Sequence, residues 1–75
     1  MKNYYVVTYV DGSTEMVANK KELAELIDYA YSYINLCFDQ GWFVFLKRQD
    51  IYTIRKVYNG ETVRTIKRKM RGDTL

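Results

Sequence analysis

The sequence contains no histidine, no proline, one cysteine and only four glycines among its 75 residues. Without histidine, the side chain that most often transfers protons near neutral pH is missing. The glycines, at positions 12, 41, 60 and 72, do not have the spacing of a phosphate-binding loop. We therefore expect a protein that is not an enzyme and that needs no cofactor.

Cys37 is the single cysteine, which excludes a disulfide within the chain and suits a reducing cytoplasm. It falls on an apolar stripe with no evident base beside it, so we expect a small buried core residue rather than a nucleophile. The carboxylates of Glu22, Glu25 and Asp28 fit the electrostatics of a helix start better than an acid–base pair. Potential metal ligands do not cluster, and no metal site is predicted.

Long hydrophobic runs are also missing. No stretch approaches the roughly 20 apolar residues of a membrane span, and Asp11-Gly12 interrupts the apolar start of the chain. No export signal is expected. We therefore expect a cytoplasmic protein with no membrane partner.

Hydrophobic residues make up 48% of the chain and aromatic residues 16%, a composition that predicts one folded domain over residues 1–75. Residues 3–10 form a predicted hairpin with the chain after Asp11-Gly12. Asn19 and Glu22 resemble a capping box that opens a helix over residues 20–37. A continuous apolar run over residues 42–46 predicts a strand buried on both faces. Residues 51–58 and 61–69 form a second hairpin around Asn59-Gly60.

The predicted fold class is therefore α+β, in the order β-β-α-β-β-β, with an antiparallel sheet and one helix packed on one face. If Asp11-Gly12 is a two-residue loop, one face of the first hairpin carries Tyr5, Val7, Tyr9 and Met16, and the other carries Tyr4, Val6, Val10 and Val17. Neither face is purely polar. Either a curled, barrel-like sheet or a homodimer is needed to cover what the helix leaves open.

Charge divides the chain into two parts. Residues 1–46, the acidic hairpin–helix part, carry three cations against six carboxylates, a net charge of −3. Residues 47–75, the basic C-terminal hairpin part, carry nine cations against three carboxylates, a net charge of +6. Such a concentrated basic segment predicts a polyanionic partner.

Counting back from Asn59-Gly60 places Arg55 directly opposite Arg64, with Arg68 nearby on the same face. Guanidinium groups bind phosphates bidentately, so we expect these three arginines to contact nucleic acid. Lys56, Lys67 and Lys69 fall on the other face among tyrosines and would add attraction, as in proteins that grip single strands. The alternatives are a solvated strand edge and pairing of the basic hairpin with the acidic surface of another copy.

Aromatic residues offer a different kind of site. Trp42, Phe43 and Phe45 could anchor a protein partner or a homodimer, since aromatic side chains dominate such interfaces. Their alternative role is ordinary core packing.

The runs Tyr5-Val-Val-Thr-Tyr-Val-Asp-Gly-Ser-Thr-Glu and Asn19-Lys-Lys-Glu-Leu-Ala-Glu-Leu-Ile, followed by strands, resemble small accessory proteins of bacteriophages and mobile elements. The resemblance lies in the hairpin and capped helix and assigns no functional residue. It implies a role inside a bacterial host cell, as a nucleic-acid-binding regulator or as an inhibitor of a host enzyme or defence system, with anti-CRISPR proteins as one example. Many such inhibitors imitate DNA with acidic surfaces, whereas the dense patch here is basic.

Overall fold

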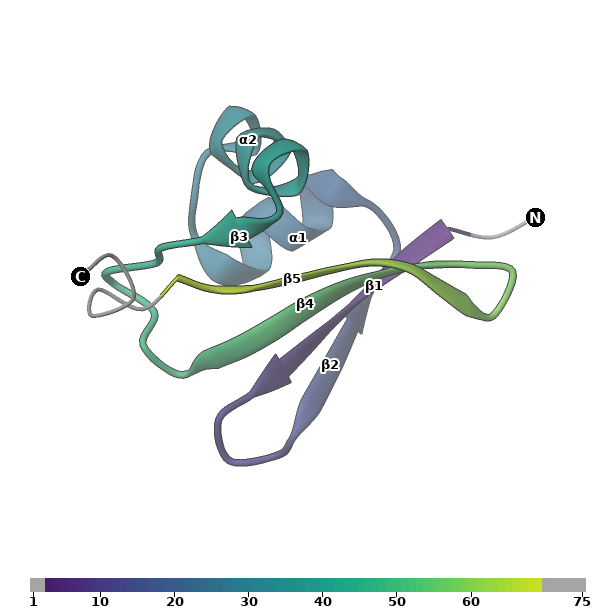
Figure 1. Ribbon diagram of the computed structural model, residues 1–75, viewed down its shortest axis with the longest axis horizontal. Helices are drawn as coiled ribbons and strands as arrows, with labels where there is room; N and C mark the ends of the chain where they lie inside the picture. Colours follow the sequence, from purple (N-terminus) through teal and green to yellow (C-terminus); the bar gives the residue numbers. More distant parts are fainter. Residues whose placement is uncertain (1–2, 70–75) are drawn as a thin grey trace.

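Two helices lie on one side of a twisted five-stranded sheet in the computed structural model, which describes residues 3–69 (Figure 1). The strands are β1 (Asn3–Tyr9), β2 (Thr14–Val17), β3 (Trp42–Phe43), β4 (Ile51–Tyr58) and β5 (Glu61–Arg68), and the helices are α1 (Lys20–Ile27) and α2 (Tyr31–Gln40). The α+β class is confirmed. Neither helix has the length and apolar character needed to cross a membrane.

The helical segment is broken in two, so the prediction of one helix over residues 20–37 was wrong. The N-terminal cap is as predicted, because the Asn19 side chain accepts a hydrogen bond from the Glu22 amide at 2.9 Å. However, α1 ends at Asp28, whose φ of 61° is left-handed. A short polar side chain tolerates that conformation better than most residues do. Ala30 is extended and α2 then begins.

The sheet is mixed rather than antiparallel. Its order is β2-β1-β4-β5-β3, and β3 runs parallel to β5. The apolar run over residues 42–46 contributes only the two residues Trp42 and Phe43 to a strand. Phe43 and Phe45 are fully buried, but Trp42 is half-buried and Leu46 is 71% exposed, so the prediction of a strand over residues 42–46 buried on both faces was wrong. β3 follows α2 directly after the Gly41 cap and lies at the edge of the sheet beside β5.

The first hairpin is shifted by one residue from its predicted register. Thr8 lies opposite Thr14 and Tyr5 opposite Val17. The Asp11 carboxylate accepts hydrogen bonds from both the amide and the hydroxyl of Ser13, which stabilises a loop longer than two residues. Since a shift of one residue reverses the faces, Val17 packs on the core and Met16 is 66% exposed. The predicted grouping of these side chains was therefore wrong.

The main core lies between the sheet and the two helices. Its side chains come from every helix and from the helix-facing side of the sheet; they include Tyr5, Val7, Leu23, Ile27, Ile34, Cys37, Phe43, Phe45, Ile54 and Ile66. Stacked and edge-on aromatic pairs contribute to this core, among them Phe43 and Phe45 with ring centroids 4.3 Å apart. The opposite face of the sheet has no helix over it within residues 3–69, and this uncovered face holds part of the candidate site.

Candidate nucleic-acid interface

The β4–β5 hairpin sets the position of the predicted basic residues. Its turn is as predicted, with Tyr58 opposite Glu61 and with Asn59 and Gly60 at positive φ. A bulge between Lys56 and Val57 then shifts the register. The shift places Ile66 opposite Ile54, both fully buried. Without it, Ile66 would lie opposite Thr53 on the uncovered face, so burial of Ile66 favours the bulge.

The bulge separates the arginines that were expected to act together. Arg55 lies opposite Thr65, while Arg64 lies opposite Lys56. The prediction that Arg55 faces Arg64 was therefore wrong, and the two guanidinium groups extend from opposite faces of the sheet. Beyond the bulge, every β5 side chain lies on the face of the sheet opposite to the predicted one. Arg64 and Arg68 lie on the helix side with Lys56. Lys67 lies on the side without helices, with Arg55.

Arg64 and Arg68 donate hydrogen bonds to backbone carbonyl groups. Arg64 donates through Nε and Nη2 to the Phe38 carbonyl, at 3.1 and 2.9 Å. Arg68 donates to the carbonyls of Phe45, Arg48 and Ile51, at 3.3, 2.6 and 3.0 Å. Arg68 is thereby engaged in holding the chain between β3 and β4, and is less available to a phosphate than the sequence suggested.

The side of the sheet without helices over it in residues 3–69, here called the open face, is defined by the register of β1, β2, β4 and β5. Its side chains are Tyr4, Val6 and Thr8 from β1, Thr14 and Met16 from β2, Thr53, Arg55 and Val57 from β4, and Thr62, Thr65 and Lys67 from β5. Trp42 lies beside Lys67 in the parallel pair with β3. None of these residues is acidic. Val6, Thr53 and Val57 are buried, and the accessible part of the open face presents positive charge among hydroxyl and aromatic groups.

Three cations mark this face. Arg55, half-buried at its centre, donates from Nη1 to the Thr62 hydroxyl at 3.0 Å, which leaves other guanidinium N–H groups for a ligand. Lys67 is exposed. Lys69 places its ammonium group 4.6 Å from the centre of the Trp42 ring, a cation–π distance. These three residues are the predicted contacts that lie together on the open face.

The predicted aromatic interface is mostly core. Phe43 and Phe45 have no exposed surface, so the alternative of ordinary core packing holds for both. Trp42 is half-buried and keeps some surface next to Lys67 and Lys69. Of the three aromatic residues predicted to contact a partner, Trp42 alone has exposed surface.

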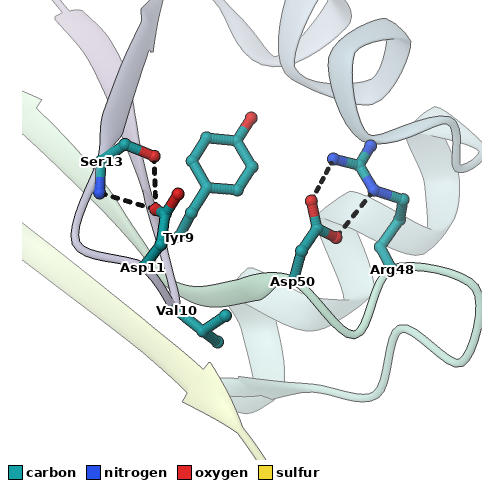
Figure 2. Close-up of a pocket in the computed structure, with 6 residues that line it drawn as sticks. All are labelled: Tyr9, Val10, Asp11, Ser13, Arg48 and Asp50. Carbon is teal, nitrogen blue, oxygen red and sulfur yellow. Dashed lines mark hydrogen bonds and ion pairs between the residues drawn. The ribbon is translucent and has the colours of Figure 1, made fainter.

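A hollow of about 410 Å³ lies between the first hairpin loop and the start of β4, lined by Tyr9, Val10, Asp11, Ser13, Arg48 and Asp50 (Figure 2). The Arg48 guanidinium pairs with the Asp50 carboxylate through two hydrogen bonds, at 3.1 and 3.0 Å. This pairing lowers the pKa of Asp50, and hydrogen bonds from Ser13 lower the pKa of Asp11.

Arg48 also donates to the Leu26 carbonyl at 3.0 Å, and the Val10 amide donates to the Asp50 carbonyl at 2.8 Å. The polar groups of the hollow thus hold the hairpin loop, α1 and the start of β4 together. In the sequence Arg48 is one of the nine cations of the basic C-terminal hairpin part, and nothing in the local pattern identifies its partner 22 residues away. No group of three or more potential metal ligands comes together within residues 3–69.

No protein-family model, no curated protein and no solved structure matches this chain. Its function is therefore inferred from the geometry of its own residues.

Proposed function

We propose that this protein binds nucleic acid through the open face of its sheet, without catalysing a reaction on it. The supporting observation is that Arg55, Lys67 and Lys69 lie on a face that, within residues 3–69, has no helix over it and no carboxylate among the side chains that form it. The proposal includes a role as a cytoplasmic accessory protein of a bacteriophage or mobile element, as the sequence resemblance implies.

The chemistry of the open face suits a flexible, negatively charged strand. Cations attract phosphates and release their counterions, while exposed ring faces stack on bases with little regard to sequence. Trp42 and Tyr4, both half-buried on this face, supply such rings beside the cations. Threonine hydroxyls on β1 and β5 add neutral donors for phosphate or sugar oxygens. This composition favours contacts with the backbone over reading of base sequence.

The test is fluorescence anisotropy of labelled single-stranded and double-stranded DNA and RNA, titrated at low and at physiological salt. We expect affinity to fall steeply with salt. The double variant Arg55→Gln/Lys67→Gln should weaken binding and flatten the slope of log affinity against log salt by about one for each lost phosphate contact.

A matched control removes the same charge elsewhere. Lys21 and Lys47 are exposed and lie outside the open face, so Lys21→Gln/Lys47→Gln should change the salt slope much less. Absence of binding at low salt, or equal losses in the two double variants, would refute the proposed site.

A second candidate function, inhibition of a host enzyme by protein contact, is favoured by the free edge of β2. This strand ends the sheet order and adjoins a hollow of about 570 Å³ lined by Tyr4, Met16, Val17, Ala18 and Glu22. An extended segment of a partner could add to such an edge. Thr14→Pro would block strand addition, and loss of a captured host protein with this variant, but not with Arg55→Gln, would support inhibition.

The same edge is where a second copy could add. Sedimentation velocity over a range of concentrations tests the predicted homodimer directly. A single monomeric species throughout would rule it out, whereas a dimer that Thr14→Pro dissociates would place its interface at β2.

A further inference from the structure

A second group of cations converges on the helix side of the sheet. A hollow of about 320 Å³ there is lined by Lys20, Phe38, Asp39, Lys56, Val63 and Arg64. Its three cations come from α1, β4 and β5, and its one carboxylate comes from α2. The ion pair found within residues 3–69 joins Arg48 to Asp50, so none of these three cations is neutralised by Asp39.

Two of the cations are held in place by uncharged groups. Arg64 donates two hydrogen bonds to the Phe38 carbonyl and fits closely against Gly41, where a Cβ atom would lie 3.1 Å from Nη2. Lys20 donates to the Asn35 side chain at 2.6 Å and lies 5.6 Å from the centre of the Phe38 ring. Each keeps further N–H groups free of these bonds, so a ligand would meet donors whose positions are already fixed.

Lys56 is the third cation of the group. It lies directly across the ladder from Arg64, and within residues 3–69 its side chain has no hydrogen bond or ion pair. Like charges directly opposite each other destabilise a sheet. An anion bound between them would remove that repulsion and accept charge-assisted hydrogen bonds from several elements at once.

We propose that this hollow is a binding site for a phosphate group, held by Lys20, Lys56 and Arg64. Phosphate is the anion class that fits best, because its several oxygens can accept from three cations at once. The site uses residues of the helix side and is independent of the open face, so it stands or falls separately from the proposed function. The phosphate could be free, part of a nucleotide, or the terminal group of a nucleic acid.

The test is titration of the ¹⁵N-labelled protein with inorganic phosphate at constant ionic strength, followed by amide chemical shifts. We expect saturable shifts confined to the residues around the hollow. Lys56→Gln should weaken phosphate binding by about fivefold. Asp39→Asn should tighten it, because the substitution removes the one carboxylate that lines the site; a purely structural role for the cations would not produce tighter binding.

Two controls keep the result specific. Lys21→Gln removes an exposed charge of α1 outside the hollow, and Lys67→Gln removes one from the open face; both should leave phosphate affinity unchanged. Shifts that do not saturate, or equal weakening by Lys56→Gln and Lys21→Gln, would overturn the proposal. The Lys56→Gln substitution does not remove the hydrogen bonds of Arg64. The dispersion of the amide chemical shifts of this variant verifies that it is folded.

Further titrations distinguish the sources of the phosphate. Tighter binding of a mononucleotide than of inorganic phosphate would assign the site to nucleotides. Tighter binding of a 5′-phosphorylated oligonucleotide than of its 5′-hydroxyl counterpart, abolished by Lys56→Gln and retained in Arg55→Gln/Lys67→Gln, would assign it to a strand end. Equal affinity for all three phosphate forms would assign it to the phosphate group alone.

Discussion

Arginine has two different roles in this protein. Arg48, Arg64 and Arg68 each donate to main-chain carbonyls distant in sequence, whereas Arg55 donates to a threonine hydroxyl on the open face. A planar guanidinium with five N–H groups can bridge several carbonyls in this way, and a lysine cannot copy that geometry. Part of the charge of the basic segment therefore serves the fold, and among these three arginines Arg64 also lines the proposed phosphate site.

Replacing Arg68 should show this structural role. Arg68→Met removes the donor to the carbonyls of Phe45, Arg48 and Ile51. We expect a loss of about 2–3 kcal/mol in the free energy of unfolding, because hydrogen bonds to charged groups exceed neutral ones and the carbonyls lose their partner. Urea denaturation measures it. Arg55→Met is the control and should cost less than half as much; equal costs would contradict the assignment.

Cys37 offers a probe of core opening. It is fully buried, and burial raises the pKa of its thiol, which lowers the fraction present as reactive thiolate. In the native protein we expect slow reaction with a disulfide reagent at mildly alkaline pH, and fast reaction once urea unfolds the chain. Rapid labelling under native conditions would show that α2 leaves the sheet readily.

At the scale of elements, the start of α1 is secured by reciprocal hydrogen bonds. The Asn19 side chain accepts from the Glu22 amide, and the Glu22 carboxylate accepts from the Ala18 amide, both at 2.9 Å. α1 is only eight residues long, too short to be stable without such support. The cap therefore fixes where the chain leaves β2 and begins to cover the sheet.

Removing the cap should destabilise the protein measurably. We expect Asn19→Ala to lower the free energy of unfolding by about 1 kcal/mol and Asn19→Ser to retain most of it, since serine also caps helices. Thermal unfolding followed by circular dichroism checks both. Lys21→Ala, an exposed change in the same helix, should have little effect, and a similar loss there would rule out the cap as the cause.

The elements that could be predicted from sequence are those specified by neighbouring residues. The Asn19–Glu22 cap and the Asn59-Gly60 turn are local, and both were confirmed. The bulge that moves Arg64 away from Arg55 is not local, because it depends on which β5 residues reach the core once β4 is fixed beside β1. The left-handed Asp28 that ends α1 likewise depends on how far the helix can extend over the sheet.

The same distinction applies to the candidate site. The basic composition of the second hairpin was evident, and Arg55, Lys67 and Lys69 remain in the proposed interface. The distribution of the other cations was not evident, because Lys20 joins Lys56 and Arg64 only after α1 has packed. Carbonyl partners such as that of Arg64 leave no pattern in a sequence, since every residue has a carbonyl group.

For the whole molecule, protonation of a few carboxylates should govern stability in acid. Arg48 lowers the pKa of Asp50, and Ser13 lowers that of Asp11. Because these pKa values are lowered in the folded state, the unfolded chain binds protons at a higher pH than the folded protein does. The stabilisation is therefore present above the unfolded pKa of about 3.9 and is lost as the pH falls below it. The chain, already at +3 near neutral pH, also gains positive charge in acid.

Asp50→Asn should make unfolding less dependent on acid pH. We expect lower stability than the unmodified protein at neutral pH, because the Arg48 ion pair is lost, and a smaller further decrease between about pH 5 and pH 3. Urea midpoints measured across this range test it. Asp39→Asn leaves the Arg48 pair intact and should keep the original pH profile; a profile flattened as much by Asp39→Asn would contradict the role given to Asp50.

The strand order β2-β1-β4-β5-β3 has a consequence for synthesis on the ribosome. β1 is made first, but it pairs with β4, and β3 waits for β5, the last strand of the described chain. A nascent chain that ends before Arg68 can form the first hairpin and the capped helix but has no edge for β3 and no cover for Phe43. Folding of the sheet must therefore follow translation of β5, and until then the aromatic residues that will form the core are open to chaperones.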